Sequence, residues 1–275
     1  MKKRTLLERM ASAPHLVWMV LFIVAPLLFV AYYAFTTPEG SFTLDNIFAL
    51  SYHAGTFGFS VCMSLISTVI CLLIGYPLAY CISRAGARAQ KILIMLIMLP
   101  MWMNLLIRTY SMMAILDDGG FLNNMLVAMG LQPVHIVGTS GAVIFGMVYN
   151  FLPYMVLPIH SVINKLDGRL IEAASDLGCN NFRILTRVIL PMSAPGIISG
   201  VTMVFVPSIS TFYISQKLGG GTFELIGDTI ERQFSNPDTY NVGAAISLVM
   251  MLLILVSMAI MNRFADGEEE GRALL

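Results

Sequence analysis

Six apolar runs, each long enough to cross a lipid bilayer, constrain this chain more than any other feature. A helix needs about 20 residues to cross about 30 Å of hydrocarbon. Lipid cannot hydrogen-bond free backbone groups, and the chain lacks the short alternating segments of a barrel, so we expect an all-α polytopic membrane protein. The six predicted spans are Leu16–Phe35, Phe57–Ile82, Ile92–Met113, Gly141–Ile163, Pro195–Ile214 and Val242–Met261.

The composition agrees with a membrane protein. Apolar residues make up 57% of the 275 residues and charged residues only 12%, with a mean hydropathy of +0.79. The formal net charge is zero, which gives no reason to expect a nucleic-acid partner. Prolines interrupt three consecutive spans, which is tolerated where a helix lines a cavity or packs on protein; they are Pro100, Pro153, Pro158 and Pro207.

The distribution of charge predicts the orientation. Thirteen of the 16 basic residues lie before the first span, after the last one, or in the connections between spans two and three and between four and five. Because such residues mark the cytoplasmic side, we expect both termini in the cytoplasm. The predicted organisation is a cytoplasmic segment 1–15, a six-span domain 16–262 with a cytoplasmic loop 164–192, and a cytoplasmic tail 263–275.

Several other readings of the chain are disfavoured. The first run is too long for a signal-peptide core and lacks a cleavage site, so it is interpreted as a retained helix. The cysteines show no C-x-x-C spacing, and neither a disulfide framework nor a metal site is expected. Gly219-Gly220-Gly221 lacks the Lys-Ser/Thr of a phosphate loop. The histidines are scattered and no catalytic motif is evident, so an enzyme is not expected; they are His15, His53, His135 and His160.

The loop between spans four and five carries its own structural pattern. Asp167 can cap a helix that begins at Gly168, and Gly178 stands where a left-handed residue ends a helix. We expect one apolar stripe on the first helix and a second helix that Pro191 stops; the stripe comprises Leu166, Leu170, Ala173 and Leu177, and the second helix would bury Phe182, Leu185, Val188 and Ile189. A structured loop of this length is usually functional.

The loop resembles the signature of permease subunits of ABC importers: E-A-A-x-x-x-G from Glu172, nine further residues, then Val188-Ile189-Leu190-Pro191. The resemblance implies that partner ATPase subunits grip this loop, bind ATP and Mg²⁺ themselves and drive alternating access, so this chain needs no cofactor of its own. It also implies a prokaryotic cytoplasmic membrane and a second, related permease subunit. The residues expected to couple to the ATPase are Glu172, Ala173, Ala174, Asp176, Gly178, Arg183 and Arg187.

Three further strings, around Pro100, Pro153 and Phe212, are similar to those of the spermidine/putrescine permeases in this family. Polyamines are flexible cations, and their amines favour carbonyls, carboxylates and aromatic faces. The candidate pathway residues are Trp102, Asn104, Tyr110, Tyr149, Asn150, Tyr154, Ser210, Phe212 and Tyr213. No acidic residue lies within the spans, so an extracytoplasmic solute-binding protein is expected to supply high affinity, docking on acidic outer loops and an amphipathic helix over 222–234.

Arg108 leaves more than one class of substrate compatible with the sequence. In a straight third span, its 17 positions from Lys91 would put it roughly 25 Å across the membrane, near the outer edge. If it faced the pathway, it would suit an anion such as sulfate, so a permease for another small ion is one alternative. The alternative from a different class is an ion-coupled secondary transporter, which would need ionisable coupling residues within the membrane.

Overall fold

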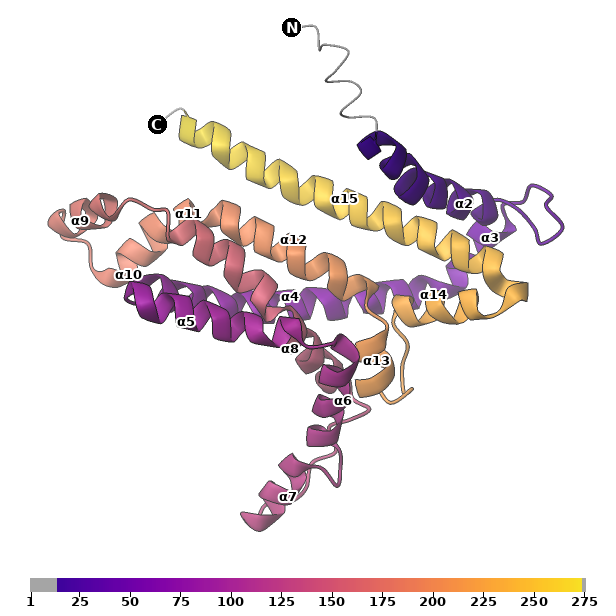
Figure 1. The fold of residues 1–275 in the computed structure, drawn as a ribbon, viewed down its shortest axis with the longest axis horizontal. Helices are drawn as coiled ribbons and strands as arrows, with labels where there is room; N and C mark the ends of the chain where they lie inside the picture. The colour runs from indigo at the N-terminus through magenta and orange to yellow at the C-terminus, as the bar shows by residue number, and fades with distance from the viewer. Residues whose placement is uncertain (1–13, 274–275) are drawn as a thin grey trace, which may run out of the picture. The chain divides into compact units, whose positions relative to one another are not determined.

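The computed structural model describes residues 14–273, and almost all regular structure in that range is helical (Figure 1). The first helix runs over Pro14–Ala34 and contains the π-turn η1 and α2. The elements are η1 (Val20–Val24), α2 (Ala25–Ala34), α3 (Asp45–Phe48), η2 (Ala49–His53), α4 (Ala54–Arg84), α5 (Ala87–Met98), η3 (Leu99–Trp102), α6 (Leu105–Leu116), α7 (Phe121–Ala128), α8 (Ser140–Ile163), α9 (Gly168–Asp176), α10 (Asn181–Ile184), η4 (Leu185–Ile189), α11 (Leu190–Met192), α12 (Ala194–Ser210), α13 (Tyr213–Leu218), α14 (Ile226–Ser235), η5 (Pro237–Thr239) and α15 (Tyr240–Ala273).

The helices confirm an all-α membrane protein. Four of them in the described range are long and apolar enough to cross a membrane: Pro14–Ala34, Asp45–Arg84, Ser140–Ile163 and Pro237–Met261. The number rises to six when each of two bent helix pairs is taken as one span. The first bent pair contains predicted span three and breaks just after Pro100. The second contains most of predicted span five but bends at Ser193, whereas Pro207, where distortion was predicted, lies inside α12.

The third predicted span is broken, not straight. Pro100 lies in a 3-10 turn, the backbone is extended at Met103, and the helices on either side, Ala87–Trp102 and Leu105–Ala128, are bent by 95°. Arg108 folds back toward the break, and its Nη1 donates to the Pro100 carbonyl oxygen at 3.0 Å. The third span is therefore not the straight helix from which the depth of Arg108 was predicted.

The chain divides into two compact units. The first contains residues 1–54 and 229–253, although residues 1–13 of the predicted cytoplasmic segment lie outside the described part. Within this unit the amide of Asn241 donates to the Tyr33 and Thr36 carbonyls. Ala34 packs with Ala244 and Ala245 in a small buried cluster. Small side chains allow α2 and α15 to approach closely here.

The second unit contains residues 55–228 and 254–275, and α8 and α12 are its most closely packed helix pair. Gly196 and Gly200 lie one turn apart on α12. A Cβ at Gly196 would lie 2.9 Å from the Pro158 carbonyl oxygen, and one at Gly200 would lie 2.8 Å from the Met155 sulfur. This is the small-x-x-x-small packing by which helices approach each other in membranes.

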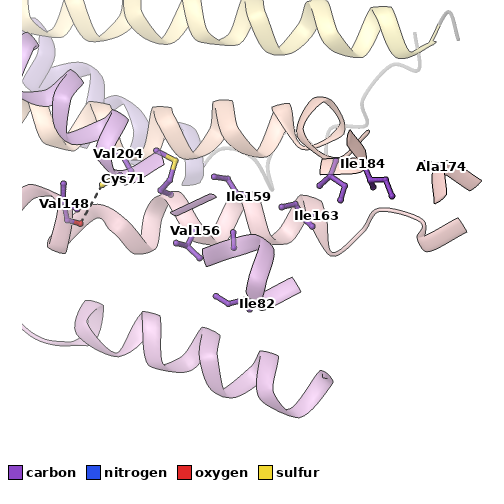
Figure 2. Packing of buried hydrophobic residues seen from close by; sticks show 12 residues of the cluster. Cys71, Ile82, Val148, Val156, Ile159, Ile163, Ala174, Ile184 and Val204 are labelled. Atoms are coloured by element: carbon purple, nitrogen blue, oxygen red, sulfur yellow. Dashed lines mark hydrogen bonds between the residues drawn. The ribbon is translucent and has the colours of Figure 1, made fainter. Parts of the chain in front are cut away.

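The buried cluster of this unit continues from the helix bundle into the loop after α8 (Figure 2). Ile159 and Ile163 of α8 lie in the same cluster as Ala174 of α9 and Ile184 of α10. At the other end, the Cys71 thiol donates to the Val148 carbonyl oxygen at 3.8 Å. The loop is thus packed onto the bundle by shared apolar contacts, which ties its position to that of α8.

The predicted tail is not a separate segment over its described part. Helix α15 continues without interruption from Tyr240 to Ala273. The expected boundary after residue 262 therefore does not coincide with the end of a helix.

Candidate functional site: the loop after α8 and the α6–α13 aromatic cluster

The loop after α8 folds as a helical pair, as its sequence predicts. The Asp167 carboxylate accepts a hydrogen bond from Arg169 N at 3.0 Å and caps α9, which begins at Gly168. Gly178 has φ +78°, the left-handed conformation that glycine adopts without steric cost. The Asn180 side chain then accepts from Arg183 N at 2.9 Å and caps α10. Two side-chain caps and one glycine thus define the turn between the helices.

The buried face of α9 differs from the predicted stripe. Leu177 is 85% exposed and Leu170 44% exposed, whereas Ile171 and Ala174 pack into the cluster. The predicted stripe is therefore wrong at Leu170 and Leu177, although its first member, Leu166, does pack against the cluster. Ala174, predicted to contact the ATPase, is buried against the bundle.

The other predicted coupling residues are presented outward. The side chains of Glu172, Asp176, Arg183 and Arg187 are exposed, and within the described range none of them makes a side-chain hydrogen bond or ion pair. Ala173 is also exposed, and a Cβ at Gly178 would have no atom within 4 Å. Phe182, expected on the buried side of the second helix, is 71% exposed. The outer surface of the pair therefore combines apolar side chains with charges of both signs. We call this surface the coupling face; it comprises Leu170, Glu172, Ala173, Asp176, Leu177, Gly178, Phe182, Arg183 and Arg187.

Pro191 does not stop the second helix, contrary to expectation. A π-turn over Leu185–Ile189 closes with Leu190 N donating to the Leu185 carbonyl oxygen, and the helix continues through Pro191 to Met192. The wider turn shifts the hydrogen-bond register just before the proline, which has no N–H to donate. The direction changes at Ser193, where the helices on either side are bent by 66°.

A buried hydrogen bond marks this bend. Ser193 is fully buried, its hydroxyl donates to the Leu190 carbonyl oxygen at 3.0 Å, and the Tyr76 hydroxyl of α4 lies 3.0 Å from the same Ser193 oxygen. Tyr76 is therefore the donor in that pair. The bond connects α4 to the junction between the loop helices and α12.

Only two of the predicted pathway residues make a recorded aromatic contact with each other across different helices. Tyr110 of α6 and Tyr213 of α13 meet edge to face, with ring centroids 6.1 Å apart. The Lys217 ammonium lies 5.2 Å from the Tyr110 centroid and 5.8 Å from that of Tyr213. Both distances are within cation–π range.

The other predicted pathway residues are placed separately. Trp102, Tyr154 and Phe212 are exposed. Asn104 caps α6, its side chain accepting from Leu106 N, and the Ser210 hydroxyl donates to the carbonyl oxygen of Val206 in its own helix. Asn150 is buried, and its amide donates to the Gly146 carbonyl oxygen. Each of these three polar side chains bonds to a backbone group of its own helix, and the Asn150 Oδ1 has no hydrogen-bond partner among the described residues.

Arg108 and Tyr149 line an apolar cleft of about 620 Å³ beside α6 and α7. The Arg108 guanidinium carbon lies 6.0 Å from the Tyr149 centroid, and among the described residues its Nε has no hydrogen-bond partner. Arg108 pairs with no acid in the described range. Its charge is instead held by the Pro100 carbonyl and an aromatic face.

The first turn of α14 departs from the predicted acidic docking surface at one residue. Asp228 is buried, and its carboxylate accepts from the Ser215 hydroxyl at 2.9 Å and from Leu225 N at 2.8 Å. It therefore fastens the start of α14 to α13. Glu224 and Glu231 remain exposed.

The sequence reasoning missed three features. Lys217 follows Tyr213 by four residues, the spacing that places side chains on one helix face. The G-x-x-x-G pattern of Gly196 and Gly200 was visible as a helix-packing motif. The bond between Tyr76 and Ser193 joins positions 117 residues apart, and no local pattern could have found it.

The chain is similar to known membrane components of transport systems. The family model described as binding-protein-dependent transport system inner membrane component matches residues 72–267. The spermidine/putrescine transport system permease protein PotB of Haemophilus influenzae is 42% identical over 253 residues, which cover 87% of this chain and 88% of the relative. The protein of the same description from Escherichia coli K12 is 38% identical, covering 87% and 92%.

Solved structures show the same fold at low identity. A chain of a bacterial ABC transporter involved in the import of the acidic polysaccharide alginate matches with TM-score 0.76 at 19% identity, covering 94% of this chain and 95% of that one. A chain of the MetNI methionine ABC transporter matches with TM-score 0.58 at 16% identity, covering 76% and 92%. With its family match and its close relatives, this chain belongs to the family of binding-protein-dependent transport system inner membrane components.

Proposed function

We propose that this chain is the transmembrane permease subunit of an ATP-driven importer that moves polyamines into the cell. The observation that carries the substrate class is the 38–42% identity, over most of the chain, to permeases named for spermidine and putrescine. The aromatic cluster of Tyr110 and Tyr213 supports it, because aromatic faces attract ammonium groups.

The coupling face is the docking site for an ATPase subunit in this proposal. Its exposed leucine and phenylalanine side chains offer apolar anchors, and Glu172, Arg183 and Arg187 offer charges that have no side-chain partner among the described residues. Apolar anchors surrounded by charges are typical of a specific protein interface. The partner supplies ATP and Mg²⁺ binding, and this chain converts movement of the loop into movement of its helices.

The remaining organisation follows from the charge distribution. The segment 1–15, the loop 164–192 and the tail 263–275 face the cytoplasm, and residues 16–262 form the membrane domain of an inner-membrane protein. A second, related permease completes the pathway. An extracytoplasmic solute-binding protein docks on the opposite side, near the exposed Glu224 and Glu231.

Uptake by the reconstituted importer tests this function. Vesicles that contain this chain, its companion permease and the ATPase should accumulate radiolabelled putrescine or spermidine only with ATP and the loaded binding protein. Sulfate should not compete. Accumulation driven by a proton or sodium gradient without the ATPase would contradict the proposal and support the secondary-transporter alternative.

The bond between Tyr76 and Ser193 leads to a prediction about coupling. Tyr76→Phe keeps the ring and removes the hydrogen bond, which is worth about 1 kcal/mol. Because this bond joins α4 to the bend at the end of the loop helices, we expect about fivefold more ATP hydrolysed per polyamine transported. The measurement is the ratio of the two rates in vesicles.

Tyr80→Phe is the matched control for this variant. Tyr80 lies one turn further along α4, and its hydroxyl makes no hydrogen bond to any residue that the structure describes. The ratio in Tyr80→Phe should equal that of the unmodified importer. Equal ratios in Tyr76→Phe and Tyr80→Phe would show that the bend needs no such connection.

A further inference from the structure

Lys217 occupies an aromatic site that its own chain builds. Its ammonium lies 5.2 Å from the Tyr110 centroid and 5.8 Å from the Tyr213 centroid, and the two rings stand at 77° to each other. The electron-rich face of an aromatic ring attracts a cation, and the ammonium lies over both rings. Such an arrangement is how proteins bind alkylammonium groups without a carboxylate.

Among the described residues, the partners of this charge are the two rings and the Tyr110 hydroxyl, with which the Lys217 ammonium shares a hydrogen bond. No ion pair joins Lys217 to a carboxylate in the range 14–273. Lys217 is also one of few basic residues outside the predicted cytoplasmic segments. A cation in this position opposes the entry of a cationic substrate unless it has a specific task.

The helix that carries Lys217 is firmly anchored, whereas the side chain is not. Ile214 and Leu218 of α13 are fully buried, and a Cβ at Gly146 of α8 would lie 2.4 Å from Leu218 Cδ1. α13 therefore sits directly against α8. Lys217 is partly exposed and Tyr110 is 47% exposed, so the side chain can leave the rings while α13 stays in place.

We propose that Tyr110 and Tyr213 form a subsite for one primary ammonium of the transported amine, and that Lys217 fills this subsite at rest as a tethered competitor. The inference rests on the proposed polyamine function. The end of a lysine side chain and the end of putrescine are both a methylene chain that carries –NH₃⁺. A surface that binds one therefore binds the other, and repulsion between like charges prevents both from occupying it together.

Competition from within the chain has a functional consequence. It weakens substrate binding in the membrane domain without weakening its selectivity for ammonium, because the rings keep their geometry. A substrate delivered at high local concentration displaces Lys217, and the returning side chain then helps to release it. A conduit needs binding that is weak enough to allow release.

Equilibrium dialysis of radiolabelled putrescine tests the proposal. The sample is the complete ATPase–permease complex without the binding protein, so that the permease subsite is measured alone. Lys217→Met keeps the length and apolar body of the side chain and removes the charge. A cation–π interaction of about 0.5–2 kcal/mol corresponds to about a 2- to 30-fold gain in putrescine affinity in this variant.

Two controls separate the subsite from a general effect of charge. Lys217→Arg keeps a cation over the rings and should bind putrescine like the unmodified complex. In Lys217→Met combined with Tyr110→Leu and Tyr213→Leu the gain should vanish. In Lys217→Met combined with Tyr110→Phe and Tyr213→Phe, the part of the gain that comes from the rings should remain and the part that comes from the Tyr110 hydroxyl should be lost. ATP-driven uptake by Lys217→Met confirms that the complex is assembled.

The outcomes distinguish this inference from the proposed function. ATP-driven putrescine uptake by the unmodified importer establishes the function regardless of Lys217. If Lys217→Met binds putrescine no more tightly than the unmodified complex, or if the gain persists without the rings, Lys217 only braces the two tyrosines and the inference is overturned.

Discussion

Gly178→Asp is expected to abolish transport-linked ATP hydrolysis while leaving the chain inserted in the membrane. Gly178 has φ +78°. A Cβ added at this position would have no atom within 4 Å, so the surrounding fold does not exclude a side chain. The constraint comes from the left-handed backbone and from the partner that approaches this exposed turn. A carboxylate buried without a partner in that interface costs about 2 kcal/mol or more, which is about a 30-fold loss of docking affinity.

Glu172→Arg tests the same coupling face through charge alone. Glu172 is exposed on α9, so reversal of its charge leaves the packing of Ala174 and Ile184 intact. We expect it to suppress binding-protein-stimulated ATPase activity as Gly178→Asp does. Gly168→Ala is the control, because Gly168 begins the same helix with open space around its Cβ and has no positive φ. Normal coupled activity in both test variants would remove the coupling face from the mechanism.

Gly200→Leu is expected to prevent the membrane domain from folding. A Cβ at this position would already lie 2.8 Å from the Met155 sulfur and 3.1 Å from the Met155 carbonyl oxygen. A leucine must therefore push α12 away from α8, the closest helix pair of its unit. Overpacking of this kind costs about 3 kcal/mol or more. The measurement is the yield of monodisperse complex and its thermal unfolding temperature in detergent.

Gly58→Leu provides the comparison for this packing prediction. Gly58 lies inside α4, and a Cβ added there would have no atom within 4 Å. Leucine should therefore lower neither the yield nor the unfolding temperature. The unfolding temperature of Gly200→Ala should lie between those of the unmodified complex and Gly200→Leu. Adding Met155→Ala to Gly200→Ala should partly restore that temperature, because it removes the sulfur that the new methyl group contacts. Equal stability of Gly200→Leu and Gly58→Leu would contradict the close packing of α8 and α12.

Features that depend on local chemistry were predictable from the sequence. The span over Gly141–Ile163 was predicted within one residue of α8, because length and hydropathy define a membrane helix. The Asp167 cap and the left-handed Gly178 were also predicted, since each is a rule about neighbouring residues. The family resemblance carried by Glu172 to Gly178 is confirmed by the match over residues 72–267.

Features that depend on distant contacts were not predictable in the same way. Periodicity on a two-turn helix could not decide whether Leu177 or Ala174 faces the bundle, because so short a helix carries apolar residues on both sides. Pro100 indicated a bend, but its 95° angle depends on the extended backbone at Met103 and on Arg108 folding back. The burial of Asp228 depends on Ser215 and Leu225, which lie on α13 and on the connection that follows it.

Photo-cross-linking from the coupling face tests the central claim most directly. Phe182 is an aromatic side chain that is 71% exposed, so p-benzoylphenylalanine can replace it with little disturbance. Tyr52, 88% exposed and outside the loop, is the matched control. In cells that produce the complete importer, the account predicts a cross-link between position 182 and the ATPase subunit, and none from position 52. Absence of the ATPase from the adducts of position 182 would contradict it.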